Sequence, residues 1–230
     1  MLSSSIDLWD IDLADEAWDA EASVLSAEEK ARFARMAPTP MKSAKRRGRI
    51  ALRAVLAGYC GAPPERLDFA YGAFGKPRLL GTELEFNLSH SGARALIAVA
   101  CEPLGVDIEQ LDQKVGNIDN LLRLICSDSE PAPSSEDDEV RRRARFFHLW
   151  TRKEAYCKAT GQGLHKDMRA FSIAKDGDRT FIIDPAASEP CRELVDLPMG
   201  YGWMACLCTH QPAPSIRRLH AKPAERAARN

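Results

Sequence analysis

Gly105-Val106-Asp107-Ile108-Glu109 carries the strongest structural signal in this 230-residue chain. Apolar and acidic side chains alternate along it, which predicts a β-strand whose Val106 and Ile108 face a core. Asp107 and Glu109 are two residues apart, so they share the opposite face of the strand. Two such carboxylates repel each other unless a cation lies between them. The pattern therefore predicts either a cation site or a solvated strand face.

A predicted helix over 140–160 carries a second motif, Trp150-Thr151-Arg152-Lys153-Glu154-Ala155, followed by Lys158 and Gly161-Gln162-Gly163-Leu164. Glu154 and Lys158 are four residues apart and share a helix face, with Lys153 slightly round it. A surface ion pair is the alternative. Together the two motifs supply three carboxylates, which suit Mg2+, and lysines, which suit phosphate. They indicate chemistry on a metal-bound phosphate ester.

The composition is that of an ordinary globular protein, with 45% hydrophobic and 28% charged residues and a formal net charge of −1. This charge gives no reason to expect a nucleic-acid partner. The seven cysteines are odd in number and lie mostly in apolar runs, which favours reduced thiols. The first residues lack a basic signal-peptide region, and no apolar run is long enough to span a membrane. We therefore expect a cytoplasmic protein without a membrane partner.

Outward from the first motif, the chain alternates short strands and helices, which predicts an α+β fold. The expected strands lie at 6–13, 67–71, 85–88, 95–100, 105–109, 171–174, 181–183 and 203–208, and the helices at 26–36, 40–59, 117–126 and 140–160. A strand–helix–strand pattern recurs at an offset of about 100 residues, which suggests two similar α+β subdomains over 1–103 and 104–210. Polar, Pro-rich composition predicts a mobile segment over 128–139 and a disordered tail over 211–230.

Two polar segments precede the first motif. Gly75-Lys76-Pro77 places a lysine on a loop, where it contacts a phosphate or nothing. Asn87-Leu88-Ser89-His90-Ser91-Gly92 follows a predicted strand as a turn that can aim hydroxyl, imidazole and backbone N–H groups at a phosphate. An ordinary polar turn is the alternative for the second segment.

The order and spacing of these four segments resemble the large bacterial, Sfp-type 4'-phosphopantetheinyl transferases, over residues 5–210. The resemblance implies a pseudo-dimer of two α+β halves with coenzyme A in the cleft between them. It also implies an enzyme that moves phosphopantetheine from coenzyme A to a serine of an apo carrier protein and releases adenosine 3',5'-bisphosphate. A covalent pseudo-dimer needs no second subunit, so a monomer is expected.

The same resemblance implies roles for individual residues. Asp107, Glu109 and Glu154 hold Mg2+. Either Glu154 or Glu130 is the base that takes the serine proton. The implied contacts to coenzyme A are Lys30, Arg32, Arg46, Lys76, Pro77, Ser89, His90, Lys153 and Lys158.

The carrier partner is an acyl, peptidyl or aryl carrier domain, as in secondary metabolism, and its type stays open. The helix over 117–126 is expected to offer it an apolar docking surface. Arg123 and the arginines within 141–145 are expected either to steer it or to form a solvated helix face. Two other functions compete with the transferase. One is a non-catalytic module that binds coenzyme A or a carrier. The other is a different Mg2+-dependent nucleotide phosphotransferase or nuclease, against which the absence of a GxxxxGK[ST] phosphate loop argues.

Overall fold

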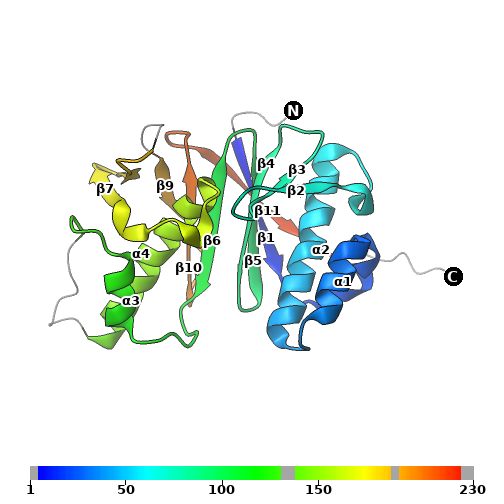
Figure 1. Cartoon of the computed structure of the whole chain (residues 1–230), viewed down its shortest axis with the longest axis horizontal. Coiled ribbons are helices and arrows are strands. Elements are labelled where there is room, and N and C mark those ends of the chain that lie inside the picture. Colours follow the sequence, from blue (N-terminus) through cyan, green and yellow to red (C-terminus); the bar gives the residue numbers. More distant parts are fainter. Residues whose placement is uncertain (1–4, 131–137, 188–191, 224–230) are drawn as a thin grey trace.

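The computed structural model describes residues 5–130, 138–187 and 192–223, and it contains two halves that lie side by side (Figure 1). Each half combines a β-sheet with one long helix. The first sheet has the strand order β11-β1-β5-β4 and the second has the order β6-β10-β9-β8-β7. This mixed arrangement agrees with the predicted α+β class.

The first half holds β1 (Ser5–Asp12), α1 (Ala27–Arg35), α2 (Pro40–Cys60), β2 (Phe69–Tyr71), β3 (Pro77–Leu79), β4 (Glu85–Ser91) and β5 (Arg94–Ala100), with 3-10 turns at Glu16–Val24 and Pro64–Arg66. The second holds β6 (Leu104–Gln110), α3 (Ile118–Ile125), α4 (Glu139–Ala159), β7 (Ser172–Asp176), β8 (Arg179–Ile183), β9 (Glu193–Asp196) and β10 (Trp203–Thr209), with 3-10 turns at Gly163–His165 and Met168–Ala170. The strand β11 (Ser215–Ala221) then returns to the first sheet. Within the described residues, no helix is long and apolar enough to cross a membrane.

The helices of the first half begin at capping residues. Ser26 accepts the N–H of Glu29, and the Glu29 carboxylate accepts the N–H of Ser26, so the expected capping box starts α1. Thr39 caps α2, which begins at Pro40 and ends at Gly61 with a φ of 60°. The predicted helix boundaries in this half are therefore confirmed to within one or two residues.

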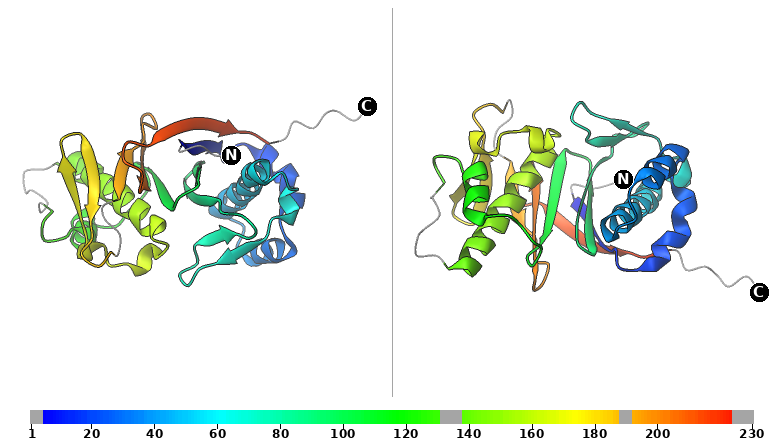
Figure 2. Two further views of the ribbon diagram at one scale, coloured as in Figure 1. Left: turned by 90° about the horizontal axis from the view of Figure 1, so that it is seen from above. Right: turned by 60° about the horizontal axis from the view of Figure 1, so that its bottom comes forward.

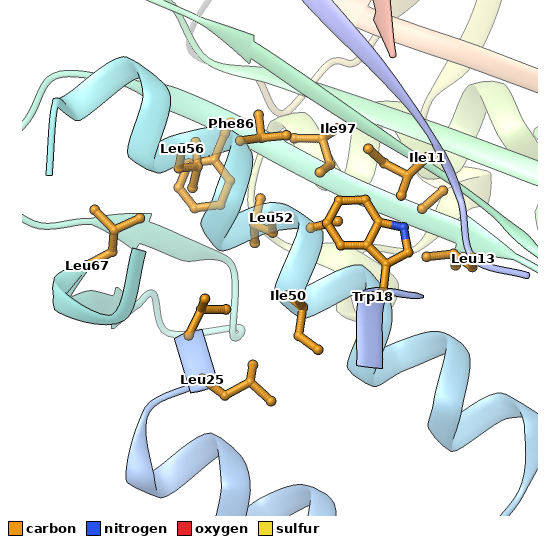
Figure 3. Packing of buried hydrophobic residues seen from close by; sticks show 14 of the residues in the cluster. Ile11, Leu13, Trp18, Leu25, Ile50, Leu52, Leu56, Leu67, Phe86 and Ile97 are labelled. Atoms are coloured by element: carbon orange, nitrogen blue, oxygen red, sulfur yellow. The ribbon is translucent and has the colours of Figure 1, made fainter. Parts of the chain in front are cut away.

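Three apolar cores among the described residues hold the fold together. One lies between α2 and the first sheet and contains Leu52, Leu56, Phe86 and Ile97 (Figure 3). Another lies between α4 and the second sheet. The third joins the halves, with side chains from β1, β5, β6 and β10. Val106 and Ile108 are fully buried in this third core, as their alternation predicted.

Side chains connect the two sheets at the seam between β4 and β6. Both are edge strands, so their outer N–H and C=O groups have no strand to pair with. Asn87, Ser89 and Ser91 project from β4 at every second residue. Asn87 Oδ1, Ser89 Oγ and Ser91 Oγ accept the N–H groups of Val106, Ile108 and Gln110 at 2.9, 3.3 and 3.1 Å. The segment 87–92, expected to be a turn, is a strand as far as Ser91, because its backbone pairs with β5 while its side chains accept N–H groups of β6.

Strand β11 corrects the expectation of a disordered tail. Residues 215–221 pair in parallel with β1, and Figure 2 shows this strand crossing from the second half to the first. Arg217 donates to the fully buried Asp7 at 2.7 and 2.8 Å, and Ile216 packs against the core between the halves. A polar tail is ordered here because β1 offers an edge and a buried carboxylate. Residues 224–230, and 131–137 of the segment expected to be mobile, lie outside the described residues.

Candidate active site

Asp107 lies on the face of β6 that meets α4. It is 3% exposed, and its Oδ1 atom accepts hydrogen bonds from Lys158 Nζ at 2.6 Å and Ser89 Oγ at 2.8 Å. Its Oδ2 atom is buried without a hydrogen-bond partner among the described residues. A buried carboxylate oxygen left unpaired is costly, and such an atom marks a place where a cation or donor fits.

One face of α4 supplies the groups opposite β6. Trp150, Glu154 and Lys158 follow one another at intervals of four residues, so they point the same way. Gly105 allows the helix to come this close. A Cβ at Gly105 would lie 2.1 Å from the Ala155 carbonyl oxygen of α4. The missing side chain therefore brings the acids of β6 within reach of Glu154 and Lys158.

Glu109 is fixed by three neutral donors from three parts of the chain. Its Oε2 atom accepts Ser91 Oγ at 2.9 Å and Gln113 Nε2 at 2.6 Å, and its Oε1 atom accepts Trp150 Nε1 at 3.0 Å. Trp150, from the second sequence motif, thus helps to orient Glu109, the second acid of the first motif. Sequence reasoning missed Ser91 and Gln113. Ser91 could have been found, because Ser89 and Ser91 repeat the two-residue spacing of Asp107 and Glu109.

Glu154 is 6% exposed, and burial raises the pKa of its carboxyl to about 7, with help from Asp107 and Glu109 and against the opposing effect of Lys158. Burial also raises the pKa of Asp107. Burial alone would lower the pKa of Lys158, but the neighbouring carboxylates raise it. The three acids and the lysine therefore form one electrostatically coupled group, with Lys158 charged at neutral pH.

This pKa predicts a pH-dependent stability in metal-free protein. Between the ordinary pKa of 4.5 and about 7, folded Glu154 keeps its proton while the unfolded chain loses it. The free energy of unfolding should therefore fall as pH rises through this window, by roughly 3 kcal/mol at most. Urea unfolding in EDTA at pH 5 and pH 8 measures it, and Glu154→Gln should show a smaller fall. An identical fall in both proteins would contradict the assignment.

The acids fit a divalent cation by charge and by donor type. When ionised, the three carboxylates and one ammonium carry a net charge of −2, and all the available donors are hard oxygens. Over 5–130, 138–187 and 192–223, no three His, Cys, Asp or Glu side chains lie close enough together to form a ready-made metal site. Lys158 is paired with Asp107 in this arrangement, at 2.6 Å. The unpaired Oδ2 atom of Asp107 nevertheless leaves a position for a ligand bond.

A pocket of about 1080 Å³ opens beside these acids, between the end of β4 and the start of α2. Glu109 and His90 line it, with Lys42 and Arg46 from α2. The pKa of His90 is lowered, chiefly by burial and then by Lys45 and Lys158. Arg46 also pairs with Asp19 at 2.7 Å. The pocket therefore offers several cationic groups next to the coupled acids, which is an arrangement that suits a polyanionic ligand.

Lys76 and Pro77 lie where the first half meets the C-terminal end of α4. Lys76 Nζ donates to the carbonyl oxygens of Leu104 at 3.1 Å and Ala159 at 3.3 Å. Ala159 is the last residue of α4, so the ammonium caps the C-terminal end of that helix. Its pKa is lowered, mainly by burial. In this structure Lys76 connects the halves, and a contact to phosphate requires it to release these carbonyls.

The basic residues of α1 lie apart from the large pocket. Lys30 Nζ donates to the Ser23 carbonyl at 3.1 Å, and the Arg32 guanidinium lies 5.1 Å from the centre of the Phe33 ring. Arg32 lines a separate pocket of about 310 Å³. The structure therefore does not bring Lys30 and Arg32 together with His90 and Arg46.

Ser89 and Lys153 were expected to contact coenzyme A, and the structure uses both within the protein. The Ser89 hydroxyl donates to Asp107 and accepts from Lys158 and the Ile108 N–H, which leaves it no free valence. Lys153 is fully buried, so it cannot reach a ligand in the cleft. The prediction for Lys153 is wrong because its helix face packs inside the second half.

Lys153 and Glu130 form a buried structural pair. Lys153 Nζ donates to the carbonyls of Ile125, Met168 and Phe171 at 2.7, 2.7 and 3.0 Å, and it lies 2.7 Å from Glu130 Oε2. The Glu130 carboxylate also accepts the N–H groups of Ser127 and Ile173. Both oxygens of Glu130 are therefore engaged, which argues against its alternative role as a base.

Replacing Lys153 with methionine should destabilise the protein by roughly 3–5 kcal/mol, because Glu130 and three carbonyl groups lose their donor in a buried place. Urea unfolding monitored by circular dichroism measures the loss. Lys175→Met is the control, since Lys175 is exposed on β7. Equal stability of the two variants would refute a structural role for Lys153.

Comparison with known proteins agrees with the geometry. The sequence model of the 4'-phosphopantetheinyl transferase superfamily matches residues 103–201. The chain is 32% identical to a 4'-phosphopantetheinyl transferase of Bacillus subtilis over 146 residues, which cover 63% of this chain and 64% of that relative. It is 34% identical over 173 residues to the 4'-phosphopantetheinyl transferase HetI of Nostoc sp., covering 72% of this chain and 73% of the relative. The transferase Sfp of Bacillus subtilis is 26% identical over 162 residues, covering 69% of this chain and 71% of the relative.

The match to HetI covers more than two thirds of both chains, and the superfamily match spans β6, α3 and α4, which carry both acidic motifs. The chain therefore belongs to the Sfp-type 4'-phosphopantetheinyl transferase family, a family of enzymes.

Proposed function

We propose that this protein transfers the 4'-phosphopantetheine group of coenzyme A to a serine of an apo carrier protein and releases adenosine 3',5'-bisphosphate. The observation that carries the proposal is the coupled group of Asp107, Glu154 and Lys158 beside a pocket with cationic side chains. The acids suit a cation on a pyrophosphate, and the cationic pocket suits the remaining phosphate of the coenzyme.

Asp107, Glu109 and Glu154 would hold Mg2+, and the unpaired Oδ2 atom of Asp107 supports this. Bound there, Mg2+ would neutralise negative charge on the pyrophosphate. The Lys158 ammonium adds a fixed positive charge at the same place, and its side chain is 24% exposed, so it is open to a ligand. Lys158 would stabilise the charge that grows on the leaving phosphate.

In the transfer step, the carrier serine oxygen forms a bond to phosphorus while the bond from phosphorus to the adenosine bisphosphate breaks. The serine proton must go to a base. Glu154 is the base that we favour, because its buried carboxyl lies beside Asp107 and Lys158 in the site and, in the metal-free protein, burial raises its pKa to about 7. Glu130 is the weaker candidate, since Lys153 and two backbone N–H groups occupy its oxygens.

The nucleotide end of coenzyme A would enter the pocket of about 1080 Å³, where His90, Lys42 and Arg46 would meet its phosphates. The carrier domain would approach the open side of the cleft, with α3 offering Leu124, which is 64% exposed. Arg143 is not available for steering, because its guanidinium donates to the carbonyls of Leu111 and Gln113. Any electrostatic steering would then fall to the other arginines of this group, which are Arg123, Arg141, Arg142 and Arg145.

The two halves would form the pseudo-dimer of the family, with subdomains over 1–103 and 104–210. In support, each half places one long helix, α2 or α4, against its own sheet, and the chain passes between the sheets at 101–103. A covalent pair of halves would act as a monomer in the cytoplasm.

Incubation with coenzyme A, Mg2+ and a panel of apo acyl, peptidyl and aryl carrier domains tests the proposal. The expected result is a carrier whose mass increases by one phosphopantetheine group, with stoichiometric release of adenosine 3',5'-bisphosphate. Binding of coenzyme A without any mass increase across the panel would instead identify a non-catalytic module.

A further inference from the structure

Gln113 connects the pocket to Glu109, although no motif in the sequence singles it out. It follows β6 in the loop that leads to α3, and both Gln113 and Glu109 line the pocket. Its Nε2 atom donates to Glu109 Oε2 at 2.6 Å, a shorter hydrogen bond than those from Ser91 and Trp150 to the same carboxylate. The Gln113 amide can therefore fix the orientation of the Glu109 carboxylate group.

The backbone of Gln113 is itself held from α4. The Arg143 guanidinium donates to the carbonyl oxygens of Leu111 and Gln113 and lies 5.3 Å from the centre of the Phe147 ring. On the other side, the N–H of Leu111 donates to the Gly202 carbonyl at 2.9 Å. Because the loop is tied at both sides, the amide of Gln113 meets Glu109 with little further loss of conformational entropy.

Within the part of the chain that the structure describes, the bonds to Glu109 leave one acceptor position of its carboxylate unused. An ionised carboxylate has about four acceptor positions, two on each oxygen. Ser91 and Gln113 fill those of Oε2, and Trp150 takes one on Oε1. Asp107 also keeps acceptor capacity, since Ser89 and Lys158 donate only to its Oδ1 atom and its Oδ2 atom is unpaired among the described residues. Among the described residues, Glu109 thus keeps one acceptor position on Oε1 beside Trp150, and Asp107 keeps its whole Oδ2 atom.

We propose that Gln113 is a positioning residue for the cation site: its amide holds Oε2 of Glu109 so that Oε1 is presented to a divalent cation. This inference rests on the proposed metal role of Glu109. Gln113 contacts neither the reacting phosphorus nor the serine and acts only through Glu109. Without the Gln113 amide, the Glu109 carboxylate still accepts hydrogen bonds from Ser91 and Trp150, but it loses the donor from the loop after β6.

Gln113→Leu removes the donor at similar volume and should weaken cation binding roughly 10-fold or more, because partners of metal ligands typically contribute 10–100-fold to metal affinity. Binding of Mn2+ alone, followed by electron paramagnetic resonance, measures this without carrier or coenzyme A. Glu109→Gln is the reference for loss of the ligand. Gln211→Leu is the matched control, as Gln211 follows the end of β10 that pairs with Leu104, at the far end of β6. Thermal unfolding checks that each variant is folded.

Weaker Mn2+ binding by Gln113→Leu, with Gln211→Leu like wild type, supports the inference. Equal Mn2+ affinity of Gln113→Leu and wild type would overturn it, and so would a wild type that shows no Mn2+ binding sensitive to Glu109→Gln. If Gln113→Leu does not fold, Gln113→Asn replaces it, since it keeps the amide but is one methylene too short to reach Glu109.

Transfer kinetics then separate positioning from a general structural defect. In Gln113→Leu, the Mg2+ concentration for half-maximal transfer should rise roughly 10-fold, while kcat, measured with saturating coenzyme A, returns to the wild-type value at saturating Mg2+. A kcat that excess Mg2+ fails to restore would contradict the positioning role. Because Mn2+ binding requires no carrier, a protein that transfers nothing but binds Mn2+ through Glu109 would refute the proposed function and leave this inference standing.

Discussion

Asp107→Asn is expected to lower kcat/KM for carrier modification by about 1,000-fold, because a bound cation supplies several kcal/mol of charge stabilisation and each 1.36 kcal/mol is tenfold in rate. The substitution keeps the size of the side chain and removes its charge. Lys158 then loses its closest partner, at 2.6 Å, and the unpaired Oδ2 atom loses its capacity to bind a cation.

The fold should survive this change. Asp107 is 3% exposed, and burial raises its pKa, so the native structure bears a cost for keeping the carboxylate ionised. A neutral amide removes that cost while the oxygen that faces Ser89 and Lys158 is retained. The free energy of unfolding is therefore expected to change little.

Mass spectrometry of an apo carrier gives the rate, and urea unfolding gives the stability. Asp112→Asn provides the control, since Asp112 is exposed in the loop just after β6. Turnover by Asp107→Asn at the rate of the Asp112 variant would remove the basis for the metal assignment. An unfolded Asp107→Asn protein would show instead that the carboxylate holds β4, β6 and α4 together.

Gly105→Ala should have the second large effect, on both stability and activity. The added Cβ would lie 2.1 Å from the Ala155 carbonyl oxygen and 2.4 Å from the Ala159 nitrogen. Both are backbone atoms of α4, which cannot move aside as a flexible side chain could. The helix must shift away from β6, at a cost of roughly 1–3 kcal/mol in the free energy of unfolding.

The same shift separates the two sides of the site. Glu154 and Lys158 belong to the part of α4 that Gly105 contacts, and Asp107 lies two residues further along β6. A displacement of about 1 Å at a reacting group costs about 100-fold in rate. Gly116→Ala is the matched control, because a Cβ there would meet nothing within 4 Å. Wild-type stability and transfer in Gly105→Ala would mean that the close approach of α4 is dispensable.

The sequence predicted those parts of the site that local periodicity determines. Alternation placed Asp107 and Glu109 on one face of β6, and a spacing of four residues placed Glu154 and Lys158 on one face of α4. These patterns depend only on neighbours along the chain. The family resemblance then named the chemistry, and the comparisons confirm the family.

Lys153 shows where local patterns are insufficient. It is adjacent to Glu154 in sequence, yet it is fully buried, and its carbonyl partners at Ile125, Met168 and Phe171 come from the ends of other elements. Helical spacing gives the direction of a side chain but does not say what packs against it. A lysine that satisfies carbonyl groups inside a core therefore has the same sequence signature as one that binds phosphate.

Strand β11 shows a second limit. Its composition is typical of a disordered tail, because Arg217, Arg218 and His220 outnumber its large apolar side chains. Its order comes from the open edge of β1 and from the buried Asp7, both more than 200 positions earlier in the chain. Composition within a window cannot report a partner at that distance.

Because β11 pairs with β1, the first sheet can be completed only after nearly the whole chain has been synthesised. The edge of β1 that pairs with β11 stays open until residues near Arg217 have left the ribosome. Arg217 follows its partner Asp7 by 210 positions. Contacts this far apart form late, and exposed strand edges invite pairing with other chains in the meantime. The first half of the molecule is thus completed only by the last strand of the fold, and we expect the open edge of β1 to be its site most prone to pairing with other chains until then.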